Sequence, residues 1–70
     1  MSVQERLDAA DAAIQGGDEE SVNAALELLQ AALADAKGEA KKKIGAAISA
    51  VNDHDVANCR SAIDEAKKAA

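Results

Sequence analysis

The chain has 70 residues, of which thirteen are acidic and eight basic, giving a formal net charge of −5. It contains one cysteine, one histidine, four glycines and no proline or aromatic residue. A chain this short forms one small domain. A lone cysteine excludes a disulfide framework. The acidic balance and the lack of aromatic rings argue against nucleic-acid binding through phosphate contacts or base stacking.

Neither the start of the sequence nor its longest uncharged stretch indicates a membrane protein. The first residues are charged and lack the apolar run of a signal peptide. No uncharged stretch is long enough to span a bilayer. We therefore expect a soluble cytoplasmic protein that binds neither membranes nor nucleic acid.

The composition predicts helices around a thin core. Nineteen residues are alanine, and only thirteen large aliphatic side chains remain. Alanine, leucine, glutamate and lysine favour helix. The expected fold class is all-α, a small antiparallel bundle of two αα-hairpins. Because so few large side chains can be buried, an isolated monomer is expected to be only marginally stable.

The first two helices have clear boundary signals. Ser2 and Glu5 form a capping-box pattern, which predicts a helix that Gly16-Gly17 ends. Asp18 is placed to cap a second helix. The apolar spacing predicts that the first helix buries Val3, Leu7, Ala10 and Ile14. It predicts that the second buries Val22, Ala25, Leu26, Leu29, Ala32, Leu33 and Ala36.

The segment 37–43 permits two interpretations. In one, the second helix stops at a turn near Gly38 and a third helix covers roughly 39–51. In the other, residues 37–43 are continuous helix, because the apolar spacing continues through them and glycine costs only about 1 kcal/mol there. An internal similarity at an offset of 34 residues supports the first. We therefore favour four helices over three.

The last helix is predicted to begin with Asn52 as its N-cap and Asp55 three residues later. Val51 and Val56 then have the spacing of a hydrophobic staple, and the buried face is Val56, Cys59, Ile63 and Ala66. The predicted organisation is a single domain, 1–70. Hairpin 1 covers about 2–36 and hairpin 2 about 39–69.

The sequence offers little chemistry. Asp53-His54-Asp55 followed by Cys59 is the one cluster of metal-ligand types. His54 and Cys59 lie about 140° apart on a helix, so they do not converge on one ion. We predict no catalytic, cofactor-binding or metal-binding residues, and no enzyme. Lys41-Lys42-Lys43 is interpreted as a solvated bend or helix face, with docking to an acidic partner as the alternative.

The function predicted from these features is a non-catalytic helical interaction or structural module. The expected partner is a second copy, forming a homodimer, or another helical protein. Leu28 lies about 100° from Leu29, so one stripe does not bury every leucine of the second helix. The predicted interface contains Leu28, Leu29 and Leu33. The alternatives are an engineered scaffold and an acidic inhibitor that mimics nucleic acid.

Overall fold

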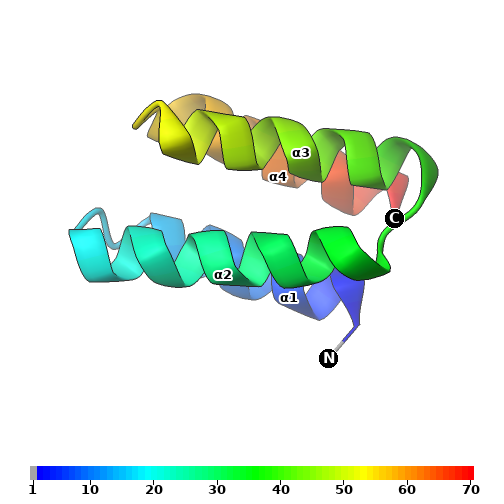
Figure 1. Cartoon of the computed structure of the whole chain (residues 1–70), viewed down its shortest axis with the longest axis horizontal. Helices are drawn as coiled ribbons and strands as arrows, with labels where there is room; N and C mark the ends of the chain where they lie inside the picture. The colour runs from blue at the N-terminus through cyan, green and yellow to red at the C-terminus, as the bar shows by residue number, and fades with distance from the viewer. Residues whose placement is uncertain (1) are drawn as a thin grey trace.

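A computed structural model describes residues 2–70 as four helices without strands: α1 (Val3–Ile14), α2 (Glu19–Asp35), α3 (Gly38–Asn52) and α4 (Val56–Ala69). Successive helices run in opposite directions (Figure 1). Each helix packs against two others, because α4 returns beside α1 and α3 lies beside α2. The prediction of an all-α bundle of two hairpins is confirmed, as is the choice of four helices.

The caps predicted for the first hairpin are present. The Ser2 hydroxyl accepts a hydrogen bond from the Glu5 amide at 3.2 Å, and the Glu5 carboxylate accepts one from the Ser2 amide at 3.1 Å. Asp18 accepts from the Ser21 amide at 3.1 Å. The turn between α1 and α2 includes Gly17 at φ 77°, a left-handed conformation that favours glycine.

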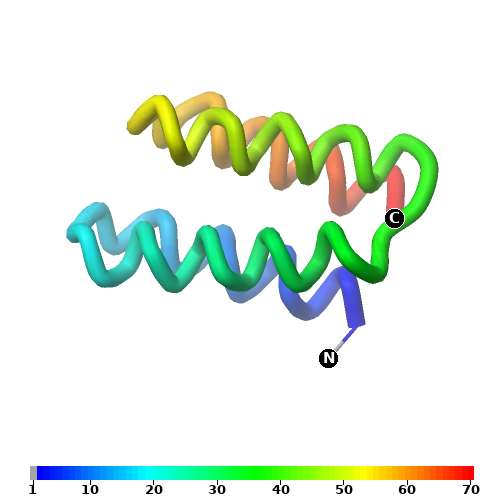
Figure 2. Tube along the Cα trace, viewed as in Figure 1, coloured from blue at the N-terminus to red at the C-terminus, as the bar shows by residue number. Residues whose placement is uncertain are grey.

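The connection between the hairpins is short (Figure 2). α2 ends at Asp35, and Ala36 and Lys37 are extended, so residues 37–43 do not continue α2. Gly38 opens α3 at φ 63°. Lys37 holds the N-cap position of α3 but makes no side-chain capping bond within the described chain. The start of α3 therefore lacks the stabilisation that Ser2 and Asp18 give to α1 and α2.

The predicted cap of α4 is wrong. Asn52 is the last residue of α3, and Asp55 is the N-cap, accepting from the Asn58 amide at 3.1 Å. The cause lies in how α3 ends. His54 adopts φ 58°, its amide donates to the Val51 carbonyl at 3.0 Å, and the Asp55 amide donates to the Ala50 carbonyl at 2.8 Å.

These two bonds form a Schellman motif, in which a left-handed residue closes the helix. Since it ends α3 at Asn52, α4 begins three residues later than predicted. Val51 and Val56 then no longer hold the positions of a hydrophobic staple. Val56 is also 40% exposed, so its predicted burial is wrong.

The core is thin, as the composition predicts. Its largest fully buried side chains are Leu7, Ile14, Leu29, Ile44, Ile63 and Cys59, and alanines occupy most other buried positions. A second group of apolar side chains is only partly buried: Val3, Val22, Leu26, Leu28, Leu33 and Ile48. Part of the limited apolar surface therefore stays in contact with solvent, although these side chains pack against the core.

Candidate functional site

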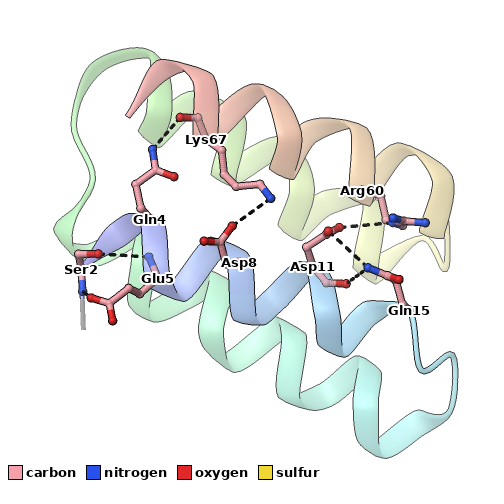
Figure 3. Close-up of polar contacts among 8 residues, drawn as sticks. All are labelled: Ser2, Gln4, Glu5, Asp8, Asp11, Gln15, Arg60 and Lys67. Carbon is pink, nitrogen blue, oxygen red and sulfur yellow. Dashed lines mark hydrogen bonds and ion pairs between the residues drawn. The ribbon is translucent and has the colours of Figure 1, made fainter.

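The edge where α1 meets α4 is closed by polar contacts (Figure 3). The Arg60 Nε lies 3.3 Å from a carboxylate oxygen of Asp11, and the Lys67 ammonium lies 3.1 Å from Asp8. The Gln4 side-chain amide donates to the Lys67 carbonyl at 2.7 Å. The hydrogen bond to Asp8 raises the pKa of Lys67. Charged side chains thus link the two hairpins along this edge.

The contacts within each hairpin also include side-chain bonds. Arg6 of α1 pairs with Asp35 of α2 and donates to the Ala31 carbonyl at 3.2 Å. Lys43 of α3 pairs with Glu65 of α4 at 3.5 Å. Three of the four helix–helix contacts therefore have a polar link.

The contact between α2 and α3 differs from the other three. Across residues 2–70, no side-chain hydrogen bond or ion pair joins these two helices. Leu26, Leu33 and Ile48 are partly buried. A Cβ atom added at Gly45 would meet nothing within 4 Å. We call this surface the α2–α3 face, defined by Leu26, Leu33, Gly45 and Ile48.

A shallow groove of about 690 Å³ opens on the α2–α3 face. Leu33 and Gly45 contribute its apolar part, and Glu39, Lys41 and Lys42 contribute its charges. Gly45 leaves the groove open because it carries no side chain. The groove lies at the end of the bundle where α2 turns into α3.

Charge changes sign along the α2–α3 face. Glu19, Leu26 and Leu33 are seven residues apart on α2, so they lie on nearly one line. Lys41 and Ile48 hold the same spacing on α3. Because the helices are antiparallel, Lys41 lies near Leu33 and the Lys37 turn, whereas Glu19 lies at the opposite end, about 21 Å from Leu33 along α2. The end near Lys41 is basic on balance, with Lys41 and Lys42 beside Glu39, and the end near Glu19 is acidic.

The predicted interface residues do not share one surface. Leu29 is fully buried at 0% exposure, so its place at an interface is wrong. Leu28 is partly buried and lies seven residues from Asp35, the partner of Arg6, which places it toward α1. Leu33 alone belongs to the α2–α3 face. Sequence reasoning missed Leu26, Gly45 and Ile48, because their exposure depends on how the hairpins dock.

The opposite end of the bundle holds a smaller pocket of about 180 Å³. Ile14, Val22 and Val51 form its apolar side, and His54 and Asp55 lie at its edge. Asp55 is occupied as the cap of α4. Among the described residues, no three His, Cys, Asp or Glu side chains are grouped as metal ligands.

Cys59 has the surroundings of a buried apolar residue. Its exposure is 0%, and it lies beside Ile63 in the core. Burial raises the pKa of its thiol, and the charges of Asp11 and Asp55 raise it further. A raised pKa lowers the thiolate fraction at neutral pH, which is the opposite of what a reactive cysteine needs.

Comparison with protein-family models, curated proteins and solved structures finds no match in any of the three. None of the helices in residues 2–70 combines the length and apolar character needed to cross a membrane.

Proposed function

We propose that this protein is a non-catalytic helical interaction module that forms a two-fold homodimer through the α2–α3 face. The observation that carries the proposal is the asymmetry between the edges of the bundle. The α1–α4 edge is closed by Asp8, Asp11, Arg60 and Lys67, whereas the α2–α3 face leaves Leu26, Leu33 and Ile48 partly exposed. Covering these side chains would supplement a thin core.

Charge supports a second copy as the occupant. A two-fold axis that lies in the interface and crosses the middle of the α2–α3 face perpendicular to the helices turns one copy end to end relative to the other. The basic end near Lys41 then lies over the acidic end near Glu19, and the reverse contact occurs at the other end. Closed two-fold dimers with such self-complementary surfaces are the commonest homo-oligomers. Complementary charges set orientation more than affinity.

The charge pattern favours this function over mimicry of nucleic acid. A mimic needs free carboxylates along one face. Asp8 and Asp11 are paired with Lys67 and Arg60, and Asp64 is paired with Lys68 at 3.3 Å. These pairs neutralise much of the acidic surface on α1 and α4. A catalytic role has no comparable support, because serine, cysteine and histidine are absent from the residues that line the groove.

Two matched substitutions on α2 test the proposal. Leu33→Glu places a charge in the α2–α3 face, whereas Leu28→Glu places the same charge toward α1. Sedimentation equilibrium is expected to show a wild-type dimer, a dissociation constant raised at least about tenfold by Leu33→Glu, and less than about threefold by Leu28→Glu. A monomer at millimolar concentration, or equal effects of the two changes, would overturn the proposal.

A further inference from the structure

The connection between the two hairpins places two core stripes in one helical register. The buried positions of α2 are Ala25, Leu29, Ala32 and the adjoining Ala36, and those of α3 begin with Ala40, Ile44, Ala47 and Val51. The step from Ala36 to Ala40 is four residues, which is itself a helical spacing. If residues 36–38 became helical, both stripes would therefore lie on one side of a single long helix. The direction of the buried side chains around this helix would change by about 80° from Ala25 to Val51.

From this register we infer that hairpin 1 (2–36) of one copy can pack against hairpin 2 (38–70) of a second copy, with α2 and α3 joined as one helix. Two such helices would lie side by side and antiparallel about a two-fold axis. Each long helix then takes part in two four-helix bundles, one at each end. The two-fold axis places both bundles on the same side of the two long helices, so the buried stripes of α2 and α3 must lie on one side of each long helix. The register meets this requirement. The core contacts between hairpin 1 and hairpin 2 of the monomer would be reproduced between copies, and those within each hairpin would stay within one copy.

The local structure at the connection favours exchange. Gly38 is held at φ 63°, and Lys37 gives no side-chain cap to α3. In a continuous helix the first amides of α3 would instead bond to carbonyls of α2. The connection of two residues is short, and short hinges favour exchange of this kind. Gly38 itself opposes exchange, because glycine is unfavourable in the interior of the continuous helix.

The exchanged dimer and the dimer through the α2–α3 face are separate associations. Exchange depends on the hinge at residues 36–38, whereas the proposed functional dimer depends on Leu33 and the charges around it. The exchanged form is also elongated, because its two bundles lie end to end. Its length would be about twice the 30 Å of the monomer. Failure of one association therefore leaves the other intact and is recognisable as such.

Two glycines provide a matched pair of variants. Gly17 and Gly38 both have positive φ, and a Cβ atom at either would meet nothing within 4 Å. Gly38→Ala penalises the closed hinge and favours the continuous helix. Gly17→Ala imposes a similar backbone penalty on a turn that both forms keep. Gly38→Ala is expected to lower the dissociation constant of the exchanged dimer about 30-fold for each of its two hinges. Gly17→Ala is expected to change this constant less than about threefold.

The experiment is size-exclusion chromatography with small-angle scattering, performed on both variants and on Lys37→Asp, which supplies α3 with a cap. We expect an elongated, slowly dissociating dimer for Gly38→Ala, which persists when Leu33→Glu is added. Lys37→Asp is expected to lower the association constant of the elongated dimer about fivefold or more. A Gly38→Ala chain no more dimeric than Gly17→Ala, or a compact dimer, would overturn the inference.

Discussion

The Arg60 guanidinium of α4 lies 3.3 Å from the Asp11 carboxylate of α1, and this pair joins the first and last helices of the chain. Its side chains are 50% and 24% exposed, so water screens the attraction. The pair matters less for stability than for its position. It occupies the edge of the bundle opposite the α2–α3 face, so the two edges differ in chemistry.

A double-mutant cycle on Asp11 and Arg60 measures this contact. We expect Asp11→Ala and Arg60→Ala to couple by less than about 1 kcal/mol in urea unfolding, because partly exposed ion pairs contribute little. The coupling should shrink further in 1 M salt. A coupling above about 2 kcal/mol would show that the pair is a principal support of the fold.

The caps of α4 give a second prediction. Asp55→Ala removes the oxygen that accepts from the Asn58 amide and is expected to lower the free energy of unfolding by about 1 kcal/mol. Asn52→Ala is expected to be near neutral, because Asn52 is exposed at the end of α3. Chemical unfolding followed by circular dichroism compares the two. Equal losses would contradict the position of the cap.

These two residues also show how far the sequence predicts the fold. Ser2, Glu5 and Asp18 are predicted correctly because each cap is local and precedes an obvious helix. Asn52 is predicted wrongly because Asn-Asp-His-Asp contains several residues able to cap. The left-handed conformation that decides among them falls on His54, where glycine or asparagine is the usual signal.

The surface is less predictable than the fold. The helical spacing places Leu29 on the apolar stripe of α2, but it does not say on which side of α2 each neighbouring helix packs. Arg6 and Asp35 place α1 on the Leu28 side, and the docking of hairpin 2 places α3 on the Leu33 side. Only tertiary contacts therefore separate a leucine in the core from one on the α2–α3 face.

His54 supports a third prediction. Its φ of 58° is costly for a side chain with a Cβ atom and free for glycine. His54→Gly is expected to raise the free energy of unfolding by about 1 kcal/mol, with the helices unchanged. Thermal unfolding of this variant beside Asp53→Gly, whose native φ is −90°, provides the control. A loss of stability in His54→Gly would argue for a role of the imidazole itself.

The cap of α2 makes stability depend on pH. Hydrogen bonds from the Ser21 side chain and amide lower the pKa of Asp18 below its ordinary value of 3.8. Because the pKa of Asp18 is lower in the folded than in the unfolded chain, the ionised cap contributes fully to the free energy of unfolding above the unfolded pKa. This contribution is lost as the pH falls through the folded pKa. Asp18→Asn keeps a capping oxygen that does not titrate. The stability difference between wild type and Asp18→Asn should therefore change between pH 5 and pH 2, measured by urea unfolding, and a constant difference would contradict the cap.

The measurement that tests the proposed homodimer most directly exchanges the charges at the two ends of the α2–α3 face. Lys41→Glu and Glu19→Lys each place like charges together in a homodimer, whereas a mixture of the two variants restores opposite charges at both ends. Sedimentation equilibrium at low salt should show that each variant alone dimerises at least about tenfold more weakly than wild type and that the mixture recovers dimerisation. Variants that dimerise as well alone as when mixed would contradict the two-fold dimer through this face.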